Sequence, residues 1–228
     1  MKLLQSPIDR IVSMLAPHYC ISCAAEGAVM CKVCLASAGQ PVEPRCAGCK
    51  KLSTGFRTCN TCRHWLDIYA VYAAAPYEGV YEQLAQAYKL DMKRPVAGVL
   101  TELLTDIEVA YPDDAVLCHV PTAPRRIRSR GFDHAKLLAK HYADVCGLPH
   151  VGLLARRSNN RQLGSSRDER FQHMLEEFYV PDAALVNGKT VVLLDDVTTT
   201  GATLAGAAKV LKAAGAKRVY AVVFASAG

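Results

Sequence analysis

The sequence predicts an α/β fold, in which a parallel sheet is flanked by helices and preceded by a small cysteine-rich domain. Short apolar runs alternate with segments whose apolar residues recur at helical spacing, which is the pattern of a parallel sheet with connecting helices. Eight of the ten cysteines fall within the first 62 residues. Hydrophobic residues make up 51% of the chain and charged residues 21%, so it has the composition of an ordinary globular protein with a substantial core.

The cysteines form four C-x-x-C pairs, and these are Cys20/Cys23, Cys31/Cys34, Cys46/Cys49 and Cys59/Cys62. A C-x-x-C turn directs two thiolates at one tetrahedral ion, so eight such ligands make two structural Zn²⁺ sites. The simplest pairing is sequential, and an interleaved pairing is the open alternative. Disulfides would need an oxidising compartment, which nothing in the N-terminal sequence indicates. We therefore predict a double zinc ribbon within residues 1–65, folded by its metal, and a second domain at 66–228.

The N-terminal segment, MKLLQSPIDRIVSMLAPHYC, has the spacing of a short amphipathic helix. Asp9 and Arg10 interrupt it, so it lacks the unbroken apolar core of a signal peptide. Apolar runs elsewhere fall short of the ~20 residues that cross a membrane. We expect a cytoplasmic protein without a membrane span. The formal net charge of +6 favours anionic partners without singling out nucleic acid.

After the cysteines, strands and helices are expected in alternation. Strands are predicted at 68–76, 115–120, 150–154, 191–194 and 218–224, and helices at 81–88, 96–111, 135–146 and 204–211. Gly215 is placed to end the last of these helices. The polar stretch 155–170 is long for a connection inside a compact domain, which is typical of a functional lid or of a disordered segment.

Residues 190–203, TVVLLDDVTTTGAT, are the most informative stretch. Four apolar residues predict a strand buried on both faces, Asp195 and Asp196 follow it, and a hydroxyl-rich turn leads into a helix. The first N–H groups of a helix lack partners and carry partial positive charge, so they suit a phosphate. The two carboxylates would repel phosphate and suit vicinal sugar hydroxyls or Mg²⁺ instead. A phosphorylated ribose with a metal satisfies both halves, whereas the plain alternative is a buried strand that ends in a solvated acidic turn.

A group of arginines follows the strand predicted at 115–120, within the segment TAPRRIRSRGF. They are Arg125, Arg126, Arg128 and Arg130. Like charges this close repel one another unless an anion joins them, and guanidinium groups bind phosphate oxygens in a bidentate way. We expect a loop here, because ligands of open α/β sheets bind at the carboxyl ends of the strands. Asp133 either holds Mg²⁺ or caps the helix beginning at Ala135, and the cap is the favoured interpretation.

Residues 190–203 resemble the motif with which type I phosphoribosyltransferases bind 5-phosphoribosyl-1-pyrophosphate (PRPP). The order of parts along nearly the whole chain resembles the ComF family of bacteria, also called the GntX or amidophosphoribosyltransferase-like family. The elements that carry this resemblance are the four C-x-x-C pairs, Arg130-Gly131-Phe132, the spacing from Arg161-Gln162 through Arg167 to Arg170, and DDVTTTGAT. That family is associated with natural competence and with the uptake of external DNA.

The resemblance implies a type I phosphoribosyltransferase-like domain that binds PRPP with Mg²⁺. Asp195 and Asp196 would hold the ribose, and the 5′-phosphate would be bound by Thr198, Thr199, Thr200, Gly201, Ala202 and Thr203. The pyrophosphate would be bound by Arg125, Arg126, Arg128 and, from the lid, Arg161. The catalytic candidates are Asp195, Asp196, Arg130 and, from the lid, Arg167.

Two positions depart from the family pattern. Asp133-His134 stands where the family usually has Asn-Gln, and Thr199 stands where base-salvage enzymes often carry an acid. Purine-type base chemistry is therefore not expected. The first hypothesis is phosphoribosyl transfer linked to competence and DNA uptake. The second is a non-catalytic module that senses PRPP or binds single-stranded DNA or another competence protein through its basic residues, which include Lys50, Lys51, Arg57 and Arg63.

Overall fold

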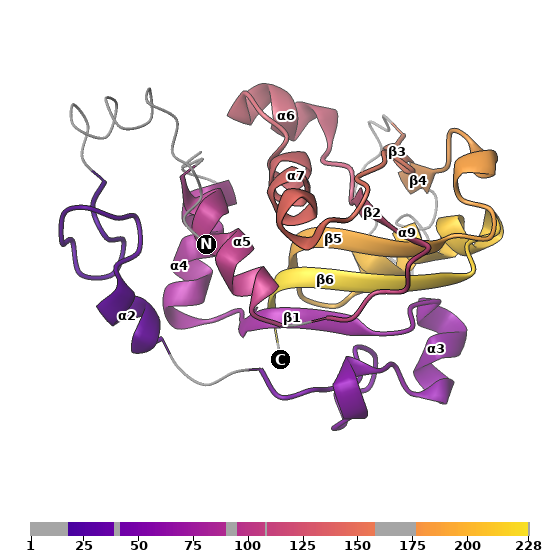
Figure 1. Cartoon of the computed structure of the whole chain (residues 1–228), viewed down its shortest axis with the longest axis horizontal. Helices are drawn as coiled ribbons and strands as arrows, with labels where there is room; N and C mark the ends of the chain where they lie inside the picture. Colours follow the sequence, from indigo (N-terminus) through magenta and orange to yellow (C-terminus); the bar gives the residue numbers. More distant parts are fainter. Residues whose placement is uncertain (1–17, 39–41, 90–94, 108, 158–176, 228) are drawn as a thin grey trace, which may run out of the picture.

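The computed structural model describes residues 18–38, 42–89, 95–107, 109–157 and 177–227. At its centre four parallel strands lie in the order β1-β6-β5-β2 (Figure 1). The strands are β1 (Val71–Pro76), β2 (Ala115–His119), β5 (Thr190–Thr198) and β6 (Arg218–Ser226). All four carboxyl ends therefore reach the same edge of the sheet, which is where an α/β protein binds ligands.

Beside β2, the strand predicted at 150–154 is reduced to a single parallel bridge between Leu117 and His150. The prediction is wrong in length because the chain turns away after this bridge. It then forms a small antiparallel hairpin from β3 (Ala155–Arg156) and β4 (Phe178–Tyr179). The 3-10 turn η2 (Ala183–Leu185) leads from this hairpin to β5.

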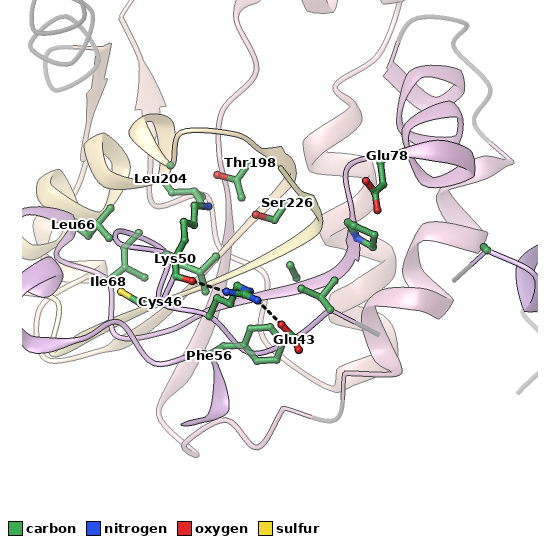
Figure 2. Close-up of a pocket in the computed structure, with 18 residues that line it drawn as sticks. Glu43, Cys46, Lys50, Phe56, Leu66, Ile68, Glu78, Thr198, Leu204 and Ser226 are labelled. Atoms are coloured by element: carbon green, nitrogen blue, oxygen red, sulfur yellow. Dashed lines mark hydrogen bonds and ion pairs between the residues drawn. The ribbon is translucent and has the colours of Figure 1, made fainter. Parts of the chain in front are cut away.

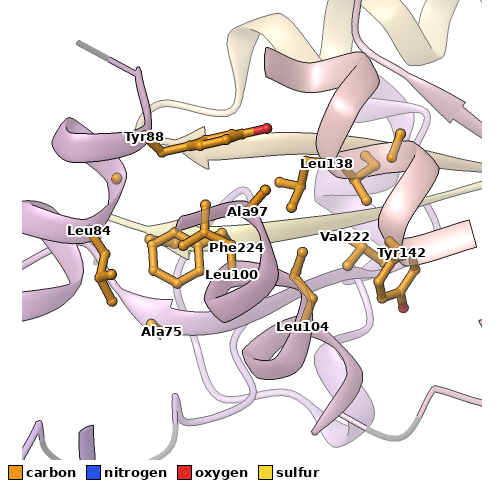
Figure 3. Close-up of a cluster of buried hydrophobic side chains, with 14 of the residues drawn as sticks. Ala75, Leu84, Tyr88, Ala97, Leu100, Leu104, Leu138, Tyr142, Val222 and Phe224 are labelled. Atoms are coloured by element: carbon orange, nitrogen blue, oxygen red, sulfur yellow. The ribbon is translucent and has the colours of Figure 1, made fainter. Parts of the chain in front are cut away.

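One face of the sheet is covered by α4 (Gly79–Lys89), α5 (Val96–Thr105) and α7 (His134–Cys146). Figure 3 shows apolar side chains of these helices packed over Val222 and Phe224 of β6. Helix α5 ends at Thr105, six residues before the predicted end at Tyr111. The Thr105 hydroxyl donates to the carbonyl of Glu102, and such local side-chain bonds compete with continuation of a helix.

The opposite face is covered by α9 (Ala202–Ala213) and α3 (Asn60–Leu66). In β5, Val192 and Leu194 turn toward the first face, while Val191 and Leu193 turn toward α9. Burial on both faces is the reason that this strand reads as an unbroken apolar run. Gly215, at a φ of +92°, follows α9 as predicted.

The cysteine-rich region contains α2 (Lys32–Ala36), the 3-10 turn η1 (Thr54–Phe56) and α3. Its second half, residues 42–66, is hydrogen-bonded to the sheet, because the backbone N–H of Thr58 donates to the carbonyl of Tyr69 and the N–H of Tyr69 donates to Val219. Leu66 closes α3 and is buried in the core beneath α9. The division of the chain between residues 65 and 66 stays a prediction.

The expected arginine loop is a helix, α6 (Pro124–Arg130). Proline at the first helical position has the φ that a helix needs, and Gly131, at a φ of +72°, ends the helix. The predicted N-terminal helix and the lid residues Arg161 and Arg167 lie outside the described residues. Within the described ranges, no helix combines the length and the apolar character needed to cross a membrane.

Candidate functional site

The acid pair lies inside β5 and not beyond its end. The strand continues through Asp195 and Asp196 and remains paired with β6 as far as Thr198, opposite Ser226. The predicted strand ended at Leu194, because a single sequence does not show how far a neighbouring strand extends. Consequently Asp196 is only 3% exposed and turns toward α4 and α7.

The buried carboxylate of Asp196 is compensated by two helices. Lys89 Nζ, at the end of α4, lies 2.9 Å from Oδ1, and His134 Nε2, at the start of α7, lies 3.1 Å from Oδ2. Arg130 Nη1 lies 2.9 Å from the other ring nitrogen, Nδ1. A guanidinium group only donates hydrogen bonds, so Nδ1 is the acceptor of this contact, while Nε2 is the ring nitrogen nearest Asp196. The polar chain Arg130–His134–Asp196–Lys89 thus joins α6, α7, β5 and α4.

The two neighbouring acids have opposite pKa shifts. Burial and the charge of Asp196 raise the pKa of Asp195 to about 8. Burial also acts to raise the pKa of Asp196, but His134 and Lys89 outweigh it and lower that pKa to about 2. Burial thus favours the protonated form of Asp195, whereas its partners favour the charged form of Asp196. Asp196 is therefore already paired inside the protein, and the role of both acids in holding a ribose stays a prediction.

Asp133 caps α7, as favoured by the sequence. Its Oδ1 accepts a hydrogen bond of 3.1 Å from the backbone N–H of Lys136 and one of 2.8 Å from the hydroxyl of Thr122. A carboxylate at the N-terminus of a helix complements the free N–H groups there. The cap holds His134, the next residue, in place to reach Asp196.

The predicted phosphate loop is the turn between β5 and α9. Thr198 is the last residue of the strand, Thr199 and Thr200 are exposed, and Gly201 adopts a φ of +76° as the N-cap of α9. The N–H of Ala202 lies 3.4 Å from the hydroxyl oxygen of Thr200. The first turn of a twelve-residue helix therefore opens beside the acid pair, with a glycine that lets the backbone approach a ligand closely.

The four arginines of α6 do not act as one group. Arg125, Arg126 and Arg128 are exposed, whereas Arg130 is half-buried against His134. Burial and the neighbouring charge of Arg126 lower the pKa of Arg130. Because these residues lie on a helix, Arg126 and Arg130 share one side of it, four residues apart. The structure brings Arg130 together with the acid pair and leaves the other three on the surface.

The ends of the predicted lid are anchored beside this helix. Arg156 of β3 donates to the carbonyl of Pro121, which follows β2, and is paired with Glu177. The guanidinium of Arg156 also stacks on the ring of Phe178, 5.5 Å from its centre. Arg157 and Glu177, which are joined by a backbone hydrogen bond of 2.8 Å, therefore lie next to the segment that leads into α6.

The thiols form two clusters with the sequential grouping that was predicted. The first contains Cys20, Cys23, Cys31 and Cys34, and the second contains Cys46, Cys49, Cys59 and Cys62. Within each cluster the sulfur atoms lie within 4.8 Å of one another, and Cys23 and Cys31 are 3.7 Å apart. A tetrahedral zinc ion with bonds of ~2.3 Å separates its sulfur ligands by roughly 3.8 Å. Both clusters therefore fit a zinc ion.

Backbone N–H groups favour thiolates in both clusters. The N–H of Cys31 lies 3.4 Å from Cys20 Sγ, and the N–H of Cys59 lies 3.4 Å from Cys46 Sγ. Burial acts to raise the pKa of Cys20 and of Cys46, but these and neighbouring N–H groups outweigh it and lower each pKa to about 6. The deprotonated form is the one that binds a metal.

Two site residues were not singled out from the sequence. Lys89 begins a basic stretch, KLDMKR, of a kind that is typical of solvated segments between helices, and His134 was noted only as a departure from the family pattern. A signal was present for His134, since it follows a helix-capping aspartate directly. Nothing local distinguishes Lys89, because only the packing of α4 against the sheet brings it to Asp196.

Part of this chain is similar to proteins of a known family. Residues 127–228 match the model of the phosphoribosyl transferase domain. The structure of a glutamine PRPP amidotransferase from B. subtilis, complexed with ADP and GMP, overlaps 61% of this chain and 30% of its own, with 22% identity and a TM-score of 0.44. The C-terminal part of the chain is a phosphoribosyltransferase-type domain.

Two relatives span both the cysteine-rich region and this domain. Competence protein ComFC of Streptococcus pneumoniae is 26% identical over 193 residues, which is 83% of this chain and 84% of that protein. ComFC of Bacillus subtilis is 26% identical over 174 residues, or 75% of this chain and 68% of that protein. The chain is homologous to the competence protein ComFC, as the resemblance to the ComF family predicted.

The opposite environments of the two acids predict opposite effects of the same substitution. Asp196→Asn leaves Lys89 without its counter-charge and His134 without its carboxylate partner, and breaking a buried pair costs roughly 3 kcal/mol where one partner reaches solvent. In a protein of this size, that cost lowers the melting temperature by about 6–12 °C. Thermal unfolding followed by circular dichroism measures it.

Asp195→Asn is the matched control, and its effect depends on pH. The raised pKa means that folded Asp195 keeps a proton that the unfolded chain releases between pH ~4 and 8, so wild-type stability falls as pH rises through this window. An asparagine has no such proton. We expect equal melting temperatures at pH 5 and a variant more stable by a few degrees at pH 8. Equal destabilisation by both substitutions would contradict the assignment.

Proposed function

We propose that the C-terminal domain binds PRPP together with Mg²⁺ and transfers its phosphoribosyl group. The observation that carries the proposal is the continuous path from the acid pair of β5, through the turn at Gly201, into the N-terminus of α9. It offers carboxylate oxygens and backbone N–H groups side by side, which suits a ribose 5-phosphate. The names of the ComFC relatives extend the proposal to a role in competence.

Within this site the two acids have different tasks. Asp195, half-buried and without an ion pair in the described part of the chain, faces the ribose hydroxyls. Asp196 is held by Lys89 and His134 and positions Asp195. Mg²⁺ prefers oxygen ligands, so it would be held by oxygens of the pyrophosphate and by at most one of these two carboxylates. When bound, it would neutralise negative charge on the leaving pyrophosphate.

The transfer step needs positioning more than covalent help. The bond from the ribose carbon C1 to the pyrophosphate oxygen breaks, and pyrophosphate leaves with the electron pair. A nucleophile of the acceptor forms the new bond to C1. Arg130 lies near the acids to stabilise the departing charge, and the exposed arginines of α6 extend that positive surface.

Calorimetric titration with PRPP and Mg²⁺ tests this proposal. Asp195→Ala removes both carboxylate oxygens, so binding should weaken roughly ten- to hundredfold, which corresponds to about 1.4–2.8 kcal/mol. Asp114→Ala is the matched control, because that carboxylate is paired with Lys217 at the opposite end of the sheet. Wild-type affinity in a folded Asp195→Ala protein, or no PRPP binding by the wild type, would refute the proposal.

We infer that each cysteine cluster holds a structural zinc ion. Metal analysis of protein purified without added metal should give close to two equivalents per chain, because both thiol groupings match zinc. Cys49→Ser should lose about one equivalent. Cys146→Ser, an exposed cysteine outside both clusters, should keep two. A folded wild-type chain without zinc would overturn the inference.

A second candidate function is single-stranded DNA binding, which one observation favours. The guanidinium groups of Arg57, Arg63 and Arg218 lie 5.6, 4.9 and 5.0 Å from the centre of the Tyr69 ring. Positive charge around a half-buried aromatic ring suits phosphates and a base stacked at its open side. The cluster lies at the amino end of β6, opposite the acid pair, so both functions are compatible.

Fluorescence anisotropy with a labelled oligothymidine tests this second function. Affinity should fall steeply as salt rises, because phosphate contacts release counterions. The double variant Arg57→Ala, Arg218→Ala should flatten the dependence on log salt by about two units, whereas Lys32→Ala on α2 should leave the affinity almost unchanged. Salt-insensitive binding, or none at low salt, would exclude this function.

A further inference from the structure

A cavity of about 490 Å³ lies between the second half of the cysteine-rich region and the sheet. One wall comes from residues 42–56 and from α3. The other comes from the ends of β1, β5 and β6 and from the start of α9 (Figure 2). Its volume falls within the range of small-molecule sites.

Neither acid of the pair lines the cavity. Its sheet residues Val71 and Ala73 belong to the core beneath α9, as does Leu204, whereas Asp196 turns to the opposite face, toward α4 and α7. The two regions meet only at the phosphate loop. Thr198 and Gly201 line the cavity on one side, and the same turn opens the N-terminus of α9 on the other.

The lining defines the chemistry that would fit. In Figure 2 the side chains of Leu66, Ile68 and Phe56 form an apolar side, and hydroxyl groups of Thr198 and Ser226 lie across from them. Two cations reach the cavity, but both are engaged. Arg45 is paired with Glu43, and Lys50 Nζ donates to the carbonyl of Ala227 at 3.3 Å. An uncharged ligand with an apolar body and a polar edge matches this lining better than an anion does.

The backbone at Phe56 is strained. Phe56 has a φ of +60°, directly after Gly55 at the same angle, and a bulky residue rarely adopts this conformation. Such strain raises the free energy of the folded state, and it persists only where the surrounding structure holds the residue in place. Here it places an aromatic ring in the cavity wall, where the ring also packs against Tyr72 with centres 5.6 Å apart.

We propose that this cavity is a second ligand site, which holds a small, uncharged aromatic ring compound with a polar edge. The ring packs against Phe56 and the apolar wall, and its polar edge meets the hydroxyl groups of Thr198 and Ser226. Since Thr198 and Gly201 belong to both regions, ligand binding in the cavity is linked to occupancy of the phosphate loop. Only this linkage rests on the proposed function.

Saturation-transfer NMR with the wild-type chain, without PRPP, tests the site itself. The probes are indole, adenine and uracil, which share a flat ring and differ in the polarity of its edge. At least one should bind with a dissociation constant at or below about 1 mM, as ligands of this size do, and show contacts to the Phe56 ring protons. Failure of all three to bind would overturn the proposal, as would contacts elsewhere only.

Two variants and a control locate the ring. Ala73→Leu fills the cavity from the sheet, and Phe56→Ala removes its aromatic wall, so each should weaken ring binding by about tenfold or more. Leu52→Ala lies in the same half of the cysteine-rich region, is 69% exposed and does not line the cavity, so it should bind as the wild type does. Wild-type binding by both folded cavity variants would refute the site.

A PRPP titration with and without the bound ring tests the linkage. The ring should change the affinity for PRPP by about threefold or more in the wild type, and reciprocally, with no change in Ala73→Leu. Absence of PRPP binding would refute the proposed function while the ring measurements stand by themselves. PRPP binding that ignores the ring would refute the linkage.

Discussion

A parallel sheet has to be buried on both of its faces, and most of this structure follows from that constraint. Helices α4, α5 and α7 cover one face, and α9 with α3 covers the other. Because α3 begins directly after Cys59, the second cysteine cluster is drawn against the sheet and is not a separate appendage. The second thiol cluster and the packing of the sheet are therefore parts of one arrangement.

The same constraint places a charge where water does not reach. Extending β5 past its apolar run buries the carboxylate of Asp196, and a buried charge needs partners. Lys89 and His134 supply them from two different helices, and Arg130 orients the histidine. The polar chain thus gives the carboxyl edge of the sheet a defined geometry before a ligand arrives, which is the preorganisation that the proposed binding and transfer require.

The phosphate loop has a different environment on each side. Toward α4 and α7 it adjoins carboxylates and cations, whereas toward α3 and α9 it adjoins an apolar cavity with hydroxyl groups at one side. This asymmetry arises because β5 alternates between the two faces, so neighbouring residues of one strand serve different surroundings. It also explains how Asp195 and Asp196, adjacent and chemically identical, differ in the pKa of their carboxyl groups.

The sequence by itself determined the order of the four central strands and of the main helices in the second domain, the four C-x-x-C turns, the cap at Asp133 and the acid–turn–helix path after Leu194. These features depend on residues close together in the chain, where spacing and propensity decide. Tertiary structure alone decided that the arginine segment is a helix with only Arg130 turned to the acids, that β5 continues to Thr198, and that Lys89 reaches Asp196. It also decided the cavity beside Phe56. These contacts join residues that are far apart in the chain or lie on neighbouring strands. Local sequence does not show which distant group will compensate a buried charge or which segments will enclose a cavity.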